Sequence, residues 1–500
     1  MYIIRFLRHS GLPVILLLLC AILVPVSAAD HKIVVIGDPH VMAEELLVKD
    51  GKVFQKYLSG GTKNPDFSKA IFEAAVSNIL DMKPKPELVL IVGDITKDGE
   101  LPSHNYVKSK LDELKAAGVA TLVIPGNHDW GKRASAVYYD GDTKYSATTC
   151  VRFGFSDNSL EQIYADYGFV RCWKDSASTS VPVERESEES TLTYACEPIP
   201  GIVIIGIDSG NDGVLSENTL DWVCDKAYTA SSKGKLVLPM MHHPLISHNT
   251  AGSHILYPNM EDAGIGYEMV RNRLADSGVK AVLTGHIHTH DIAQDWNADF
   301  SRTIYDITTG MLSHYPCYYR VLTFNKERNE LIITSKRTSG IGKSLLGDSF
   351  NLEDLKARFI KAGEGLKSKL VSEGLNKDTA FLVTPYLASL YIYSREGDEH
   401  KNADAQKLLD VLPPLLMNLP YYYDFVNSAL QNKSHYGTDR EAQTDDCSLI
   451  INLNNGITSI DSRYVSGSPE VWYTMDGLAV LGTPKRKGVY ICSGRKIVIR

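Results

Sequence analysis

The sequence predicts an α/β protein built on a largely parallel sheet. From about residue 32 to residue 283, short runs of β-branched and aliphatic residues alternate with segments whose apolar residues recur at helical spacing. Some short runs, such as Leu88–Val92, are apolar at every position, which is typical of strands buried on both faces. Alternating strands and helices connect by right-handed crossovers, so we expect neighbouring strands to be parallel.

The first predicted elements are three strands separated by two helices. In the first helix, Ile71, Ala75 and Ile79 recur every four residues and form an apolar stripe. In order, the elements are the strand Lys32–Ile36, the helix Phe67–Met82, the strand Leu88–Val92, the helix Ser103–Ala117 and the strand Thr121–Ile124.

A stretch from residue 131 to residue 190 interrupts this order. It contains many tyrosines, few aliphatic residues and the acidic run Glu184–Glu189. We expect this insertion to be either a lid over a neighbouring site or a solvated loop. The alternation then resumes with the helices Ser216–Ala230 and Glu261–Ala275 and the strands Thr191–Ala195, Gly201–Ile207, Lys235–Leu238, Val279–Leu283, Thr303–Thr308, Tyr319–Asn325 and Glu330–Ser335.

The chain divides into four predicted parts. Residues 1–29 form a leader, residues 30–345 the α/β domain, residues 346–435 a helical accessory region and residues 436–500 a β-rich tail. The helical region begins where leucine and phenylalanine start to recur at helical spacing after Asn351, and prolines at 413–420 break or bound its helices. In the tail, Val489–Ile491 and Ile497–Ile499 are expected to pair across a tight turn.

The leader has the pattern of a secretory signal peptide. Arg5 and Arg8 precede an apolar run from residue 11 to residue 26, and small residues follow it, so we expect cleavage after Ala28 or Ala29. The run is short and broken by prolines, which disfavours a membrane-spanning anchor. We therefore expect a secreted, periplasmic or cell-surface protein.

The charge bears on the class of partner that we expect, and the cysteine content bears on zinc sites and disulfides. Cleavage would remove two arginines and no acidic residue, which takes the formal charge from −8 to −10. This charge and the lack of a basic stripe disfavour a nucleic-acid partner. Seven of the eight cysteines would remain, none in a C-x-x-C pair, which argues against zinc ribbons, and an exported chain permits disulfides.

Five predicted strands end in residues that can donate oxygen or nitrogen to a metal. Open α/β sheets bind their ligands at the carboxyl ends of the strands. Aspartate, asparagine and histidine together suit divalent transition metals. The strand ends are Gly37-Asp38-Pro39-His40, Gly93-Asp94, Gly126-Asn127-His128-Asp129, Met241-His242-His243-Pro244 and Gly285-His286-Ile287-His288.

In this order, the motifs resemble those of the calcineurin-like metallophosphoesterase superfamily, over about residues 32–335. The resemblance implies a two-sheet α/β/β/α sandwich and two divalent transition-metal ions, Mn, Fe or Zn. Asp94 would bridge the two ions. By motif position, one ion would be held by Asp38, His40, Asp94 and His288, and the other by Asp94, Asn127, His242 and His286.

The resemblance also implies hydrolysis of a small phosphomonoester or phosphodiester, by attack of a hydroxide held between the ions. His128, whose neighbour Asn127 would be the ligand, would protonate the leaving alkoxide. Some members orient this histidine with an aspartate three residues after the bridging one. That position is Lys97 here, so Asp98 or Asp129 would have to serve instead.

Two other functions remain alternatives. One is a nuclease of the same fold, which the charge of −10 disfavours. The other is a surface-binding protein that has lost catalysis, but such a protein has usually lost a metal-binding residue, and none is missing here. The residues 473–477 and 487–499 resemble C-terminal tails of some secreted bacterial proteins and would serve export or surface attachment.

We expect His243 to pack or hydrogen-bond beside the site. Supporting and surface placements are both open for His248, His254, His290 and Asp291.

Overall fold

The computed structural model describes most of the chain from Asp30 onward. The described residues are 30–60, 63–131, 135–169, 183–187, 191–248, 265–341, 352–431, 444–454, 472–474, 479–480, 488–492 and 495–499. The leader predicted at residues 1–29 lies outside them. Among the described residues, no helix combines the length and the apolar composition needed to cross a bilayer.

The first of two large sheets has six strands in the order β15-β14-β13-β1-β2-β3. Strands β1, β2 and β3 on one side of this sheet are parallel, whereas β13, β14 and β15 on the other side pair antiparallel. The strands are β1 (His31–Ile36), β2 (Leu88–Val92), β3 (Ala120–Ile124), β13 (Tyr318–Asn325), β14 (Glu330–Arg337) and β15 (Ser448–Asn452).

The second sheet has seven strands in the order β11-β12-β10-β9-β8-β7-β6. Strands β8, β9, β10 and β12 are parallel, and both edges are antiparallel. The strands are β6 (Val183–Arg185), β7 (Tyr194–Ile199), β8 (Ile202–Ile207), β9 (Leu236–Met241), β10 (Ala281–Thr284), β11 (Asp291–Trp296) and β12 (Thr303–Thr308).

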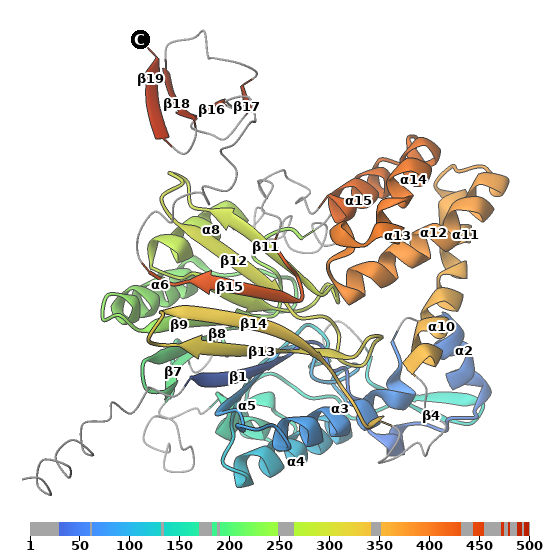
Figure 1. The fold of residues 1–500 in the computed structure, drawn as a ribbon. Coiled ribbons are helices and arrows are strands. Elements are labelled where there is room, and N and C mark those ends of the chain that lie inside the picture. Colours follow the sequence, from blue (N-terminus) through green and yellow to red (C-terminus); the bar gives the residue numbers. More distant parts are fainter. Residues whose placement is uncertain are drawn as a thin grey trace, which may run out of the picture.

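The sheets pack face to face, and helices cover their outer faces (Figure 1). Helices α3 (Pro65–Leu80) and α4 (Leu101–Ala116) pack on the first sheet, and α6 (Glu217–Ser231) and α8 (Tyr267–Asp276) pack on the second. Between the sheets, the hydroxyl of Tyr194 in β7 donates to the carbonyl of Val123 in β3 at 2.8 Å. The predicted α/β fold with two sheets is confirmed, although both sheets are mixed.

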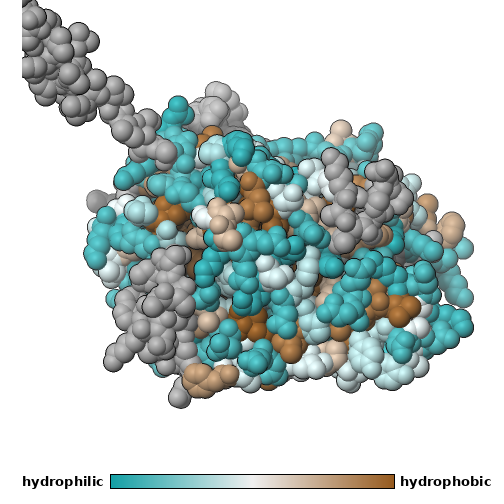
Figure 2. Space-filling model, turned by 90° about the horizontal axis from the view of Figure 1, so that it is seen from below, coloured by the Kyte–Doolittle hydropathy of each residue, from teal (hydrophilic) through white to brown (hydrophobic). Residues whose placement is uncertain are grey.

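The covering helices separate apolar from polar residues as the sequence pattern predicts. In α3, Ile71, Ala75 and Ile79 are buried against the first sheet. Ser216 caps α6 by accepting a hydrogen bond from the Thr219 amide at 3.0 Å. Figure 2 shows one face of the molecule, where hydrophilic residues predominate and hydrophobic ones gather only in small separate groups.

The insertion predicted at residues 131–190 contains regular structure where it is described. Strands β4 (Val137–Asp140) and β5 (Thr143–Ser146) form a hairpin, and α5 (Leu160–Ile163) and the 3₁₀ turn η2 (Ala165–Tyr167) follow. Tyr139 of the hairpin packs with Phe54 of α2 (Lys52–Gly60), a helix that the sequence analysis did not predict, near the 3₁₀ turn η1 (Glu44–Leu46).

The region after residue 351 is helical, as expected. It comprises α10 (Leu352–Ala362), α11 (Glu364–Ser372), α12 (Lys377–Glu396), the 3₁₀ turn η5 (Glu399–Lys401), α13 (Ala403–Gln406), α14 (Leu408–Leu416) and α15 (Pro420–Leu430). Strand β15 falls within the segment expected to be a tail, yet it pairs with β14 and completes the first sheet. The domain boundaries themselves remain predictions.

A small sheet lies at the C-terminus. Its strands are β16 (Trp472–Thr474), β17 (Ala479–Val480), β18 (Gly488–Cys492) and β19 (Arg495–Ile499), in the order β17-β16-β18-β19. The predicted hairpin is present, because β18 pairs with β19 in antiparallel register.

Candidate metal centre

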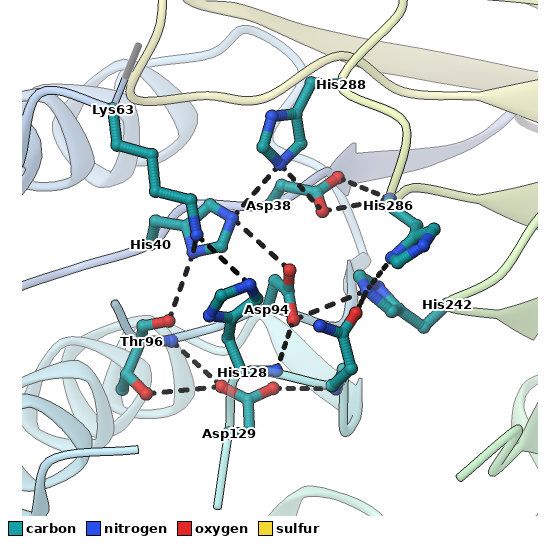
Figure 3. Close-up of polar contacts among 12 residues, drawn as sticks. Asp38, His40, Lys63, Asp94, Thr96, His128, Asp129, His242, His286 and His288 are labelled. Carbon is teal, nitrogen blue, oxygen red and sulfur yellow. Dashed lines mark hydrogen bonds and ion pairs between the residues drawn. The ribbon is translucent and has the colours of Figure 1, made fainter. Parts of the chain in front are cut away.

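The five strand ends singled out in the sequence lie together at one edge of the sandwich. The loops after β1, β2 and β3 come from the first sheet, and those after β9 and β10 come from the second. Their donor side chains point toward a common centre (Figure 3). The structure thus brings together all seven residues proposed as ligands, which are Asp38, His40, Asp94, Asn127, His242, His286 and His288.

One group of donors consists of Asp38, His40, Asp94 and His288. One donor atom from each lies within 4.8 Å of the others. His40 Nε2 is 3.1 Å from His288 Nε2 and 3.3 Å from Asp94 Oδ2, and His288 Nε2 is 3.9 Å from Asp38 Oδ1. Two carboxylates and two imidazoles therefore converge on one point.

A second group shares Asp94 with the first and adds His242 and His286. His242 Nε2 lies 3.3 Å from Asp94 Oδ1 and 3.1 Å from His286 Nδ1. The side-chain oxygen of Asn127 lies 3.1 Å from the same nitrogen of His242. Asp94 therefore offers one carboxylate oxygen to each group.

Backbone carbonyls fix the orientation of two of these imidazoles. Nδ1 of His242 lies 2.9 Å from the carbonyl of Val92, and Nδ1 of His40 lies 3.3 Å from the carbonyl of Thr96. A carbonyl only accepts, so Nδ1 of His242 carries the proton and its Nε2 faces the centre. The contact with Thr96 orients the ring of His40, whose Nε2 faces the centre as well. This arrangement is the usual support of a metal-binding histidine.

The donor set fits divalent cations and would be unfavourable without them. The facing nitrogens of His40 and His288 are 3.1 Å apart, so both are close enough to bind one ion. Burial, with repulsion from Asp94, raises the pKa of Asp38 to about 8. Positive charge between these groups would favour the ionised carboxylates and accept lone pairs from the imidazoles. Nitrogen with oxygen ligands suits transition metals such as Mn, Fe or Zn.

The backbone at the centre is strained. Asp38, His40, Asp94, His286 and His288 all have positive φ, between 42° and 68°, and they are five of the nine non-glycine residues with positive φ in the described part of the chain. Such conformations cost about 1–3 kcal/mol each and persist where the surrounding structure holds them.

Glycine at position 126 lets two strand ends approach closely. A Cβ atom there would lie 2.3 Å from Asp94 Oδ1 and 2.1 Å from the Asp94 amide nitrogen. The loop after β3 therefore runs directly against the shared carboxylate. That approach places the next residue, Asn127, in the second group.

His128 lies beside the donor groups and outside both. Its backbone amide donates to Asp94 Oδ1 at 2.8 Å, and its Nδ1 lies 2.9 Å from Asp98 Oδ1. Burial alone would raise the pKa of Asp98, but its hydrogen bond with His128 and the charge of Lys97 lower that pKa to about 2. An ionised Asp98 accepts from Nδ1, so His128 presents Nε2 to the centre.

Of the two aspartates left open by the sequence, Asp98 contacts His128. Asp129 serves the backbone instead, because its carboxylate accepts from the amides of Gly126 at 2.7 Å and Thr96 at 2.9 Å. It ties the loop after β2 to the loop after β3.

Lys63, in the segment between α2 and α3, is a site residue that the sequence analysis missed. Its Nζ atom lies 3.3 Å from Nε2 of His128 and 3.3 Å from Nδ1 of His40 (Figure 3). Burial lowers the pKa of Lys63. No strand or motif precedes this lysine in sequence, so only the fold reveals its position.

Arg395 from the helical region also reaches the centre. Its guanidinium donates to the carbonyl of Ile287 at 2.8 Å, between His286 and His288. The next-door residue Ser394 accepts from the amide of His290 at 3.1 Å. The end of α12 therefore supports the backbone of the loop that carries two proposed ligands.

Other histidines near the motifs have structural partners. His243 is buried, as expected, with Nδ1 2.7 Å from Ser209 Oγ. His248 and His290 are also buried, so surface placement is wrong for both. His248 lies 3.0 Å from Asp291, and His290 lies 2.6 Å from Ser335. His254 falls outside the described residues.

Comparison with known proteins gives a family match. A family model described as calcineurin-like phosphoesterase matches residues 31–290. A probable glycerophosphodiester phosphodiesterase, GpdQ, of Arcobacter nitrofigilis is 27% identical over 232 residues, which are 45% of this chain and 64% of that protein. The match therefore spans just under two thirds of the relative.

Two solved structures also resemble the chain. A dimetal phosphatase from Danio rerio aligns with a TM-score of 0.41 and 14% identity, over 62% of this chain and 96% of that one. The purple acid phosphatase PPD1 from yellow lupin aligns with a TM-score of 0.36 and 12% identity, over 62% of this chain and 52% of that one.

The shared carboxylate leads to a prediction about metal content. Asp94→Asn removes the charge that both groups use, so it should lower the metal content by more than one equivalent per chain. His288→Ala removes a donor from one group and should lower it by about one. Elemental analysis of purified, desalted protein measures both, with the exposed Asp225→Asn in α6 as the control. Full metal content in Asp94→Asn would contradict a shared ligand.

Proposed function

The chain belongs to the calcineurin-like phosphoesterase family, and from this premise we propose that it is a metal-dependent hydrolase of a small phosphoester. The observation that carries the proposal is the pair of donor groups joined at Asp94. One carboxylate that serves two donor groups suits two cations about 3.5–4 Å apart, the spacing used for in-line displacement at phosphorus.

Two divalent ions bound there would polarise the phosphate and lower the pKa of a water molecule. Asp38, His40 and His288 would hold one ion, Asn127, His242 and His286 the other, and Asp94 both. The carbonyl of Val92 keeps His242 in the tautomer that this ligation needs, and the carbonyl of Thr96 orients the ring of His40. The mixed nitrogen and oxygen donors favour Mn, Fe or Zn.

His128 is placed to donate a proton to the leaving group. Its backbone amide donates to Asp94, which fixes the position of the residue, and its Nδ1 contacts Asp98, so the ring cannot turn away from the centre without losing the contact with Asp98. The remaining nitrogen, Nε2, faces the side on which Lys63 lies. A leaving oxygen in hydrogen-bond reach of Nε2 would receive the proton that this nitrogen carries.

Lys63 marks where the phosphate would sit. Its ammonium group lies 3.3 Å from Nε2 of His128 and can only donate, so Nε2 accepts from it in this structure. A phosphate oxygen that replaces this contact would accept from Lys63, and also from His128 when Nε2 is protonated. A hydrogen bond to a charged group contributes about 1.5–3 kcal/mol, so Lys63 would add to substrate affinity.

A phosphodiester is the substrate class we favour. The support is the probable glycerophosphodiester phosphodiesterase among the relatives, of which this chain covers 64%. A nuclease remains the enzymatic alternative, and the formal charge of −10 after leader removal disfavours it. We also propose that the protein is exported and attached to the cell surface. The sequence of residues 1–29 and of the C-terminal tail is the only support for this part of the proposal.

The proposed function is tested with paired phosphodiesters, one with an alkoxide and one with a nitrophenolate leaving group. Metal-loaded protein should hydrolyse both, and chelation should abolish both activities. An alkoxide needs a proton to leave, so His128→Asn should reduce kcat on the alkyl ester roughly 10²–10⁴-fold. The loss on the nitrophenyl ester should be much smaller, because that group leaves without a proton.

The controls for this comparison are metal content and a second variant. Asp98→Asn should show the same preference for loss on the alkyl ester, since it releases the ring of His128 without removing it. Metal content should stay near that of the wild type in both variants. Equal losses on the two esters would overturn the proton-donor role of His128, and inactivity of the loaded wild type on every phosphoester tried would overturn the proposed function.

The role of Lys63 leads to a separate prediction about inhibition by inorganic phosphate. Lys63→Met keeps the length of the side chain and removes its charge. The inhibition constant for phosphate and the KM of a diester should both rise, by roughly 10–100-fold for loss of a charged hydrogen bond. Steady-state kinetics measure both values. Lys56→Met, on the exposed side of α2, is the matched control, and an unchanged phosphate constant with intact metal content would exclude the contact.

A further inference from the structure

A third group of possible donors lies where the helical region meets the two sheets. It consists of Asp398 and His400, which follow α12, and Asp446, which precedes β15. One donor atom from each lies within 4.8 Å of the others. None of the three belongs to the five strand-end motifs.

Reciprocal backbone hydrogen bonds hold the two aspartates together. The amide of Asp398 donates to Asp446 Oδ2 at 2.6 Å, and the amide of Asp446 donates to Asp398 Oδ1 at 2.8 Å. The amide of Ile292, in β11, donates to Asp446 Oδ1 at 3.2 Å. Two carboxylates from segments 48 residues apart are therefore fixed side by side.

The imidazole of His400 is buried without a hydrogen bond. Its side chain is 8% exposed, and its Nδ1 lies 3.8 Å from Asp446 Oδ2, beyond hydrogen-bond distance. Neither ring nitrogen has a hydrogen-bond partner among the residues that the structure describes. A buried polar group without a partner costs about 1–3 kcal/mol, so a ligand for this ring is expected.

More carboxylates surround the group. Asp291 and Glu399 are buried beside it, and each has one carboxylate oxygen with no hydrogen-bond partner in the described part of the chain. Burial, with repulsion from Asp291, raises the pKa of Asp446 well above its usual value. The same two causes raise the pKa of Glu399 to about 8.

The basic side chains nearby are engaged with other groups. His248 pairs with Asp291 at 3.0 Å. Lys401 lies 3.7 Å from Asp398 and also pairs with Asp445. The buried guanidinium of Arg320 donates to backbone carbonyls, including that of Asp446. Of the described basic residues, His400 alone lies within ion-pairing distance of the Asp446 carboxylate.

We propose that Asp398, His400 and Asp446 bind a divalent transition-metal ion, Zn²⁺ or Mn²⁺, separate from the catalytic centre. A donor set of one imidazole and two carboxylates suits these ions, whereas Ca²⁺ and Mg²⁺ take oxygen donors alone. The ion would give His400 its missing partner and offset the charge of the two carboxylates. It would also join the helical region and β15 to β11.

The position of this site gives the ion a structural role that reaches the catalytic centre. Asp398 lies two residues after the end of α12, and Arg395 of that helix donates to the carbonyl of Ile287, between two proposed ligands. An ion bound after α12 would fix the end of that helix. Its loss should lower stability first and affect the loop of His286 and His288 only through Arg395.

The test counts metal ions in full-length Asp94→Asn protein, in which the catalytic centre is weakened. The protein is stripped with chelator, incubated separately with Zn²⁺, Mn²⁺ or Ca²⁺, desalted and analysed. Addition of His400→Ala to this background should remove one equivalent of Zn²⁺ or Mn²⁺. Zn²⁺ should raise the midpoint of thermal unfolding by several degrees before, and not after, His400→Ala is added.

Two further variants keep the test decisive. His31→Ala, at a histidine outside all three donor groups, should leave the equivalent and the thermal shift in place. If His400→Ala does not fold, Asp398→Asn, whose side chain is 29% exposed, should remove the same equivalent. The proposal is overturned if Asp94→Asn protein retains no Zn²⁺ or Mn²⁺, or if it keeps its equivalent after His400 or Asp398 is changed.

Discussion

The carboxylate of Asp94 lies between two imidazoles, and the arrangement of the whole centre depends on it. Its Oδ2 is 3.3 Å from His40 Nε2, and its Oδ1 is 3.3 Å from His242 Nε2. Both imidazoles have their other nitrogen turned to a backbone carbonyl. A buried carboxylate is costly unless positive charge lies beside it. Two cations that share Asp94 meet this requirement for both groups at once.

The fold supplies the rigidity that this convergence needs. Five proposed ligands have left-handed backbone conformations, which residues other than glycine rarely adopt. They lie directly after buried strands of two packed sheets, so the cost of each conformation is offset by the core on which the strands are built. Two further side chains bind the backbone of these loops. Asp129, after a strand of the first sheet, accepts from the amide of Gly126, and Arg395, from the helical region, donates to the carbonyl of Ile287.

The sequence predicted that the proposed ligands would lie together because each follows a strand at short range. A buried run, a glycine and then aspartate or histidine form a local pattern, and parallel strands bring such ends to one edge. The supports were not predictable in this way. Asp98 contacts His128 and Asp129 contacts the backbone because of the direction in which their loops turn, which the sequence does not reveal. Lys63 belongs to no motif. Strand β15 pairs with β14 across more than a hundred residues, which periodicity does not encode.

The most direct measurement of the central claim is anomalous X-ray diffraction from crystals of metal-loaded protein, recorded at the absorption edge of the bound metal. The account predicts two peaks at the strand ends, about 3.5–4 Å apart, with one carboxylate oxygen of Asp94 about 2.0–2.2 Å from each peak. A single peak there, or two peaks of which only one contacts Asp94, would contradict it.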